Sequence, residues 1–174
     1  MWRVVLFALA TGLRQRNVLD LEWSRVNLED GHASIGANQS KNGKPIAVPL
    51  NATALAALQR QLGKHSEKVF TFAGKPLGRA NARAWRNALK RAGVENFRWH
   101  DLRHTWASWH RQSGTPTHEL QRLDGWRSSV MVERYAHLAP DQLAEAASKI
   151  VSLLGGYDFA TPEKDKELAS MLTP

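Results

Sequence analysis

Short amphipathic segments that each stop at a glycine constrain the fold of this chain more than any other sequence feature. Glycine commonly follows the last turn of a helix, because it adopts a left-handed conformation at little steric cost. Three such segments are residues 2–11, 81–92 and 101–113, which precede Gly12, Gly93 and Gly114. Apolar residues at helical spacing predict further helices at residues 17–23, 52–62, 116–123, 128–135 and 140–154. The sequence therefore predicts a mostly helical protein.

Polar residues and a proline predict where several of these helices begin. Asp101 is placed to cap the helix that follows it. Thr115 and Pro116 predict a cap and a first helical residue, because proline lacks an amide hydrogen that the first turn would leave unpaired. Ser128 or Ser129 can cap the next helix. We therefore expect three successive helices in this part of the chain.

A β-hairpin is predicted before the middle of the chain. Residues 32–36 and 45–50 are short strand candidates. Between them, Asn42-Gly43 is a strong two-residue turn signal, because both positions accept positive φ. Lys41 is therefore expected at the tip of the hairpin.

Prolines indicate that the sheet is small. Pro45 and Pro49 cannot donate backbone hydrogen bonds, which favours an edge position over a large central strand. Val69 and Phe70 are a candidate third strand. The expected fold class is thus α+β, mostly α-helical with a small antiparallel three-stranded sheet.

Composition limits the class of protein and of partner. With 174 residues and 43% apolar content, the chain is expected to form one folded domain. A net charge of +8 and a pI of about 10.2 favour a polyanionic partner, nucleic acid ahead of a membrane surface. The absence of cysteine excludes disulfides and thiolate metal sites and is compatible with a reducing compartment. The apolar start only loosely resembles a signal peptide, and no apolar run approaches the roughly 20 residues of a membrane span.

Several common ways of acting on phosphate lack their residues here. No close cluster of carboxylates with a histidine matches a two-magnesium nuclease site. The motif THEL at residues 117–120 lacks the second histidine of a zinc protease helix, and no glycine-rich loop ends in GK[ST]. Phosphate chemistry in this chain would therefore depend on cationic side chains.

Suitable cations and a nucleophile are present in separate segments. His100 and Arg103 are three residues apart, so both lie on one face of the predicted helix. Together with Arg14, the Arg103 guanidinium could bind the non-bridging oxygens of one phosphodiester. Lys41 suits protonation of a leaving alkoxide, and Tyr135 could attack phosphorus covalently.

Five short motifs, in order, resemble the catalytic domain of tyrosine recombinases, the phage-integrase family. The family pattern has a TG[LM]R box, a hairpin lysine, an HxLRH box, a GH or GW position and, nine residues later, a tyrosine. The matching residues are Thr11-Gly12-Leu13-Arg14, Lys41 before Asn42-Gly43, His100-Asp101-Leu102-Arg103-His104, Gly125-Trp126 and Tyr135. The match spans roughly residues 5–153 and implies the catalytic-domain fold of DNA breaking-rejoining enzymes.

The resemblance implies a role for each of six residues. Arg14 and Arg103 would hold the scissile phosphate, Lys41 would protonate the leaving 5′-oxygen, His100 would assist proton transfer, Trp126 would lie beside the phosphate, and Tyr135 would form a 3′-phosphotyrosine link. Because that covalent link conserves the phosphodiester until rejoining, the resemblance implies no metal and no cofactor.

The chain departs from the family pattern at two positions. Many relatives carry a glutamate where this chain has Asn17, which cannot offset the charge of Arg14. Trp126 replaces the usual histidine, and an indole cannot transfer a proton, so His100 is expected to do the proton work alone. His104 and His137 match family positions, and packing near the site is their expected role.

The resemblance also implies how the chain is organised. We expect a catalytic domain at residues 1–154 and a flexible tail at residues 155–174. The N-terminal core-binding domain of the family is absent from this sequence, as expected of a catalytic fragment. By the same resemblance, the protein is expected to act in the bacterial cytoplasm, associated with the nucleoid.

The expected partner is double-stranded DNA at attachment sites. A basic helix face offers phosphate contacts through Arg83, Arg86, Lys90 and Arg91, although such a face could also be merely solvated. The predicted helix 140–154 either packs on a neighbouring subunit of a DNA-bound tetramer or closes its own domain. Accessory DNA-bending or directionality factors are possible partners, and a membrane is not.

The expected function is that of a phage-type or prophage-type integrase, which cleaves and rejoins duplex DNA without metal. Two alternatives stay open at this point: relaxation of supercoils in the manner of a type IB topoisomerase, and DNA binding without catalysis. The recombinase interpretation depends on whether Arg14, Lys41 and Arg103 converge on one pocket that faces Tyr135.

Overall fold

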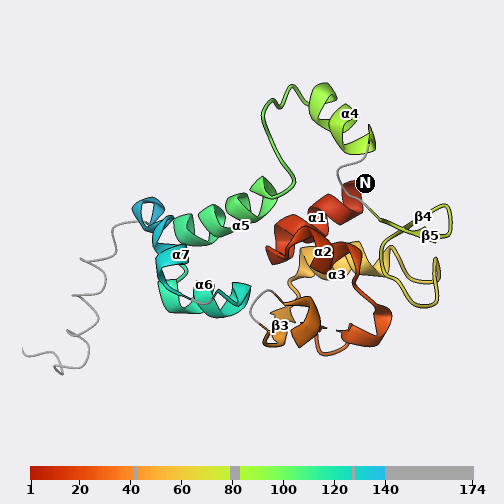
Figure 1. Cartoon of the computed structure of the whole chain (residues 1–174), viewed down its shortest axis with the longest axis horizontal. Coiled ribbons are helices and arrows are strands. Elements are labelled where there is room, and N and C mark those ends of the chain that lie inside the picture. Colours follow the sequence, from red (N-terminus) through yellow and green to blue (C-terminus); the bar gives the residue numbers. More distant parts are fainter. Residues whose placement is uncertain (41–42, 79–82, 127, 140–174) are drawn as a thin grey trace, which may run out of the picture. The chain divides into compact units, whose positions relative to one another are not determined.

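The computed structural model describes residues 1–40, 43–78, 83–126 and 128–139 (Figure 1). Its α-helices are α1 (Trp2–Thr11), α2 (Gln15–Leu19), α3 (Ala52–Gln59), α4 (Arg83–Arg91), α5 (Asp101–Gln112), α6 (Thr117–Asp124) and α7 (Val130–Glu133). Its strands are β1 (Val26–Asn27), β2 (His32–Ile35), β3 (Ile46–Pro49), β4 (Thr71–Phe72) and β5 (Lys75–Pro76). Short 3₁₀ helices are η1 (Trp23–Arg25), η2 (Ala37–Gln39) and η3 (Ala136–Leu138). The predicted α+β class, with helices predominating, is confirmed.

The predicted hairpin strands pair as expected. β2 and β3 run antiparallel, with His32 opposite Pro49 and Ile35 opposite Ile46. The sheet has the order β1-β2-β3, so β3 and its proline lie at an edge, as the prolines predicted. Lys41 and Asn42, at the expected tip, lie outside the described residues.

The predicted third strand is wrong. The third member of the sheet is β1, which pairs with β2, whereas Val69 and Phe70 belong to no strand. Both side chains are fully buried, and the Phe70 ring lies 5.2 Å from that of Phe7. The backbone amide of Val69 donates to the carbonyl of Leu21. This segment therefore packs into the core, and the separate β4–β5 hairpin follows it.

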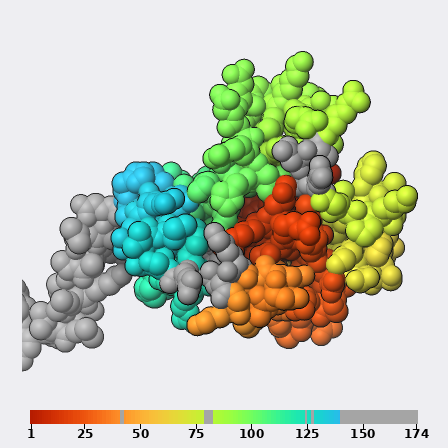
Figure 2. Space-filling view, in the orientation of Figure 1, coloured from red at the N-terminus to blue at the C-terminus, as the bar shows by residue number. Residues whose placement is uncertain are grey.

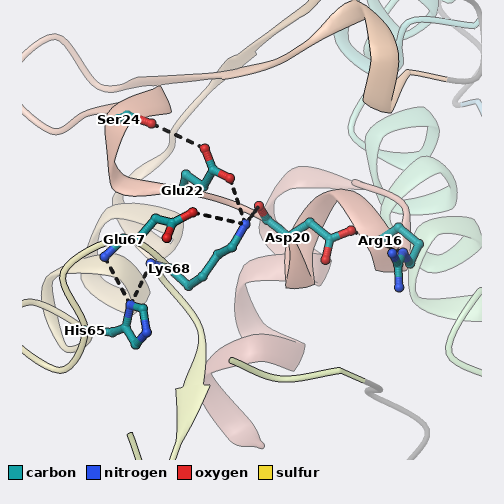
Figure 3. Close-up of polar contacts among 7 residues, drawn as sticks. All are labelled: Arg16, Asp20, Glu22, Ser24, His65, Glu67 and Lys68. Atoms are coloured by element: carbon teal, nitrogen blue, oxygen red, sulfur yellow. Dashed lines mark hydrogen bonds and ion pairs between the residues drawn. The ribbon is translucent and has the colours of Figure 1, made fainter. Parts of the chain in front are cut away.

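The helix predicted at residues 17–23 is shorter and earlier than expected. α2 ends at Leu19, because the next residues extend to meet residues 67–69, where Trp23 N donates to Glu67 O. Lys68 reinforces this junction: its Nζ lies 2.7 Å from Glu22 Oε1 and 3.4 Å from the Asp20 carbonyl (Figure 3). The inward positions of Val18, Leu19 and Leu21 were predicted correctly, since all three are buried.

The larger of two buried clusters, here called the N-terminal core, lies around α1. It joins α1, α2, the three-stranded sheet, α3 and the segment leading into α5, as the adjacent ribbons in Figure 1 illustrate. Representative members are Phe7 of α1, Val18 of α2, Ile35 of β2 and Leu58 of α3. α1 itself packs against both α3 and α5.

The smaller buried cluster, here called the C-terminal cluster, lies where α5, α6 and α7 meet. Its members are Trp106, Ala107, Leu120, Val132 and Tyr135. In the space-filling view, the cyan and blue residues of this region cover the adjoining part of α5 (Figure 2). Because α5 also supplies Leu102 to the N-terminal core, one helix contributes to both clusters.

Several predicted helix boundaries need correction. α3 stops at Gln59, so Leu62 is 53% exposed and does not join the predicted apolar face. α6 begins at Thr117, because Thr115 still belongs to the end of α5, where its amide donates to the His110 carbonyl. α7 ends at Glu133, where the chain turns toward η3.

The predicted cap of α5 is also wrong, whereas its end is confirmed. Asp101 is the first residue inside the helix, and its carboxylate reaches back to accept from the Arg98 amide at 2.7 Å. α5 ends just before Gly114, as predicted. The first residues of the predicted helix 81–92, the helix 140–154 and the tail 155–174 lie outside the described residues.

Candidate active site

The turn after α1 is the structural base of the site. Gly12 ends α1 in the left-handed conformation, with φ of 66°. A Cβ atom on Gly12 would lie less than 3.0 Å from ring atoms of Trp106, so this residue must be glycine for α1 and α5 to approach. Arg14 follows two residues later as the half-buried N-cap of α2. Close packing of α1 on α5 thus delivers Arg14 to the face of α5 that carries the HxLRH box.

Arg103 is held beside that turn. Its side chain is only 5% exposed, and its Nη1 donates to the Gly12 carbonyl at 2.8 Å. This hydrogen bond joins residues 91 positions apart and ties the two arginine segments together. A buried guanidinium with a fixed backbone contact is oriented before any anion arrives.

Trp126 and Tyr135 lie on the other side of Arg103. The Arg103 guanidinium carbon lies 5.2 Å from the centre of the Trp126 ring, a cation–π geometry. The Trp126 ring in turn stacks on the Tyr135 ring, with 6.1 Å between centres and 19° between planes. Tyr135 is 8% exposed, so the phenol lies within the site and not out in solvent.

The turn that carries Trp126 is fixed against the sheet. Gly125 ends α6 with φ of 63°, and a Cβ atom there would lie 2.9 Å from Ile46 Cδ1. The Trp126 amide and carbonyl both bond to Gln121, at 3.1 and 3.2 Å. The indole is therefore placed by β3 on one side and by α6 on the other.

Two histidines line the same face of α5. His100, the residue before the helix, meets the His104 ring edge to face at 4.9 Å. His104 Nδ1 is hydrogen-bonded to the Tyr135 hydroxyl. Although much of His100 is exposed, partial burial of its ring lowers its pKa, and the neighbouring charges of His104, Arg103 and Arg14 add to that effect. His100 is thus held as a neutral base near neutral pH.

A neighbouring carboxylate, Asp101, offsets this positive charge only in part. Asp101 is engaged by Arg98, whose amide and guanidinium donate to it, and these contacts lower the Asp101 pKa. Arg14 forms no ion pair with any residue that the structure describes. These residues therefore present excess positive charge, which suits an anionic ligand such as a phosphodiester.

The structure brings five of the six predicted site residues into one neighbourhood: Arg14, His100, Arg103, Trp126 and Tyr135. The sixth, Lys41, lies outside the described residues. His104, for which only packing was expected, contacts the phenol directly. The spacing of His104 one helical turn after His100 was a signal that both rings share a face.

Asn17, the departure from the family pattern, lies next to this site in sequence and is buried. It is 4% exposed, and its amide nitrogen has no hydrogen-bond partner among the described residues. An asparagine amide carries no charge, so Asn17 has none with which to offset that of Arg14.

The predicted basic face is displayed on α4. Arg83, Arg86, Lys90 and Arg91 are all exposed, while Trp85 is buried and packs on Phe97 and Trp99 at 6.1 and 5.3 Å. The aromatic contacts hold one side of the helix and leave the cations in solvent, as amphipathic spacing predicted.

Other kinds of site find less support in the described residues. Among them, no group of histidine, aspartate or glutamate residues is arranged to hold a metal ion. In the same part of the chain, none of the helices has the length and apolar character to cross a lipid bilayer.

Comparisons with known proteins show the family of this chain. A model of the phage integrase family matches residues 3–142. The integrase of Salmonella phage P22 is 48% identical over 166 residues, which cover 87% of this chain and 43% of that protein. The chain thus spans less than half the length of this relative.

Solved structures share the fold. The catalytic domain of bacteriophage HP1 integrase superposes with a TM-score of 0.67 and 28% identity, covering 88% of this chain and 83% of that one. XerH site-specific recombinase bound to a palindromic difH substrate superposes with a TM-score of 0.66 over 84% of this chain and 44% of that one, at 24% identity. The match of a family model to most of the chain, over a site built from the family's own motifs, places this protein in the phage integrase family.

Proposed function

We propose that this chain is the catalytic part of a site-specific tyrosine recombinase, an integrase that cleaves and rejoins duplex DNA through a 3′-phosphotyrosine intermediate. The proposal rests mainly on a series of side-chain contacts: Tyr135 stacks on Trp126, and Trp126 contacts Arg103. Arg103 is in turn hydrogen-bonded to the turn that leads to Arg14. A phenol near a fixed guanidinium, with a second arginine on the adjoining turn, suits in-line attack on a phosphodiester.

Each residue has a defined task in this proposal. Arg14 and Arg103 bind the non-bridging oxygens and stabilise the negative charge that develops on them. Trp126 packs beside the phosphate, and Tyr135 attacks phosphorus. His100, with its lowered pKa, is a neutral proton carrier. Lys41 protonates the leaving 5′-oxygen, a role that rests on the family resemblance alone.

Duplex DNA is the proposed partner. XerH was solved bound to its difH substrate. In this chain, the exposed cations of α4 can make sequence-independent contacts with the phosphates of DNA. We propose contacts from Arg83, Arg86, Lys90 and Arg91 to the DNA backbone. Replacing them should weaken binding about equally for all DNA sequences and reduce its salt dependence.

The organisation of the whole protein is likewise a proposal. The catalytic domain would extend over residues 1–154, followed by a tail at residues 155–174. We propose that the complete protein assembles as a tetramer on its attachment sites, with accessory DNA-bending or directionality factors. The relatives that match this chain are integrases and recombinases, which gives no support to a relaxing topoisomerase or to a non-catalytic regulator.

The proposal is tested by trapping the covalent intermediate. The chain is incubated, in chelator, with a library of nicked duplexes randomised around the nick, and denaturing gels reveal protein joined to DNA. Wild-type protein should form the adduct without metal, and Tyr135→Phe should not, while retaining DNA binding. The sequence contains one other tyrosine, so Tyr157→Phe is the matched control and should react normally. An adduct that survives Tyr135→Phe and disappears with Tyr157→Phe would exclude the proposed nucleophile.

The role of the arginines has its own test. Arg103→Lys keeps the charge but loses the planar fork that binds two oxygens at once. It should therefore reduce adduct formation by roughly 10²-fold or more, as expected for a lost transition-state donor. The exposed Arg98 is the matched control, and Arg98→Lys should cleave normally.

A further inference from the structure

The family resemblance assigns no catalytic role to His104. The structure nevertheless places its ring next to the hydroxyl of Tyr135, the proposed nucleophile. Its Nδ1 is hydrogen-bonded to the Tyr135 hydroxyl, and the two rings lie 6.0 Å apart. On its other side, His104 meets His100 at 4.9 Å. His104 therefore lies between the expected proton carrier and the nucleophile.

The surroundings of this pair suit proton transfer. Tyr135 is almost fully buried in the C-terminal cluster, and Trp126 stacks on one face of its ring. A phenolate formed here has little water to stabilise it, so a directly bonded acceptor determines how easily the proton leaves. His104 is half-buried and is held in position by α5.

We propose that His104, and not His100, takes the proton from the nucleophile. This inference rests on the proposed recombinase function and names a further catalytic residue for it. For Nδ1 to accept, the resting ring carries its proton on Nε2. His100 then serves as the next proton carrier beyond His104.

The hydroxyl proton of Tyr135 moves to Nδ1 of His104, and the phenolate oxygen forms the new bond to phosphorus. The bond between phosphorus and the 5′-oxygen breaks, and that oxygen leaves with a proton from the general acid, assigned above to Lys41. In rejoining, the 5′-hydroxyl gives its proton back to the general acid and attacks phosphorus, the phosphotyrosine bond breaks, and His104 returns its proton to the leaving phenolate.

The first test needs no DNA and so stands apart from the proposed function. In ¹⁵N-histidine-labelled protein, NMR distinguishes a protonated ring nitrogen from an unprotonated one. We expect the His104 Nδ1 of the neutral ring to be unprotonated, and Tyr135→Phe to shift its resonance because the bonded hydroxyl is removed. A proton found on Nδ1 would make the phenol oxygen the acceptor and would overturn the inference.

The second test separates proton transfer from positioning. His104→Asn places an amide near the position of Nδ1 and can hold the phenol, but it cannot take up a proton. We expect His104→Asn to cleave about 10²-fold more slowly than wild type in a single turnover, with DNA affinity unchanged. His118→Ala, at an exposed position on α6, is the matched control and should cleave at the wild-type rate.

The pH profile provides the readout that a purely structural role would not change. The titratable groups that face His104 are His100 just before α5, Asp101 at the start of α5, and Tyr135 from the turn after α7. Wild-type cleavage should rise with pH and then level off. In His104→Asn the rate should keep rising toward alkaline pH, because hydroxide then has to take the proton of the nucleophile. A slow variant with the wild-type profile would reduce His104 to positioning and overturn the proton-acceptor role.

A substrate with a better leaving group distinguishes a defect in protonating the leaving oxygen from a defect in activating the nucleophile. A bridging sulfur in place of the 5′-oxygen leaves as a thiolate and needs no general acid, so it should rescue Lys41→Ala. It should not rescue His104→Asn, because that defect lies on the nucleophile. Rescue of both variants alike would contradict the inference. If wild type forms an adduct but His104→Asn equals it in rate, the inference fails while the proposed function stands.

Discussion

The N-terminal core and the C-terminal cluster differ in size and in the catalytic groups that they hold. The N-terminal core extends through α1, the sheet and α3, and it fixes the turn that carries Arg14. The C-terminal cluster has few members, and one of them is the proposed nucleophile itself. The phosphate-binding residues thus belong to the well-packed part of the domain, whereas Tyr135 depends on a small cluster that can open at lower cost.

Removing a buried leucine from the N-terminal core should have the largest effect on stability. Leu58 is fully buried, so Leu58→Ala should lower the free energy of unfolding by about 2–5 kcal/mol. Urea denaturation measures this change. The matched control is Leu62→Ala, at a 53% exposed position, which should stay within about 0.5 kcal/mol of wild type. Equal costs at both positions would contradict the assigned core.

The contact between the two clusters should be nearly as sensitive. Gly12→Ala introduces a Cβ atom against the Trp106 ring and strains a positive φ, so it should cost about 2–4 kcal/mol. Because the same turn orients Arg103, cleavage should fall as well. Gly93 has a similar φ of 64° but open space around it, so Gly93→Ala should cost only about 1 kcal/mol. A Gly12→Ala variant no less stable than Gly93→Ala would mean that α1 and α5 can separate freely.

A change inside the C-terminal cluster should act locally. Val132 is fully buried, and Val132→Ala should cost about 2 kcal/mol. We expect faster amide hydrogen exchange at residues 130–138 with unchanged protection in α1 and α3, together with less covalent adduct. Val130→Ala, at an exposed position of the same helix, is the control. Uniformly faster exchange over the whole domain would show that the clusters unfold as one unit.

The smallest effect is expected at the ion pair between Glu22 and Lys68, two residues that belong to neither cluster. The hydrogen bond from Lys68 is the main cause of a lowered pKa for Glu22. A carboxyl whose pKa is lowered on folding stabilises the protein above its unfolded pKa, and this contribution disappears as the pH falls through its folded pKa. Glu22→Gln should therefore lower the melting temperature slightly at pH 7 and not at strongly acidic pH. Glu29→Gln, at an exposed position, should change it at neither pH.

Local patterns predicted much of this domain, and long-range contacts account for the rest. The glycine after α1 and the strands β2 and β3 were predictable, because each depends on neighbouring residues. The two-residue strand β1 was not, since it is too short to show alternation. Val69 and Phe70 show why an apolar pair is ambiguous: the same residues suit a strand or a core-filling segment.

The candidate site, too, was predictable from local patterns only in part, and long-range contacts determine the rest. Motif order predicted that Arg14, Arg103 and Tyr135 would belong together, and the described structure places them in one neighbourhood. The burial of Arg103 and the hydrogen bond from His104 to Tyr135 depend on how α5 meets distant segments. No local pattern records such contacts, which is why His104 was expected only to pack.

The close approach of Gly125 to Ile46 couples the turn that carries Trp126 to the edge strand β3. A displacement of the edge strand at Ile46 would therefore act directly on the turn that carries Trp126. Grafting a corner from a related enzyme into this chain would therefore require transfer of its facing strand as well. An engineer who varies one half alone would misalign the ring that supports the nucleophile.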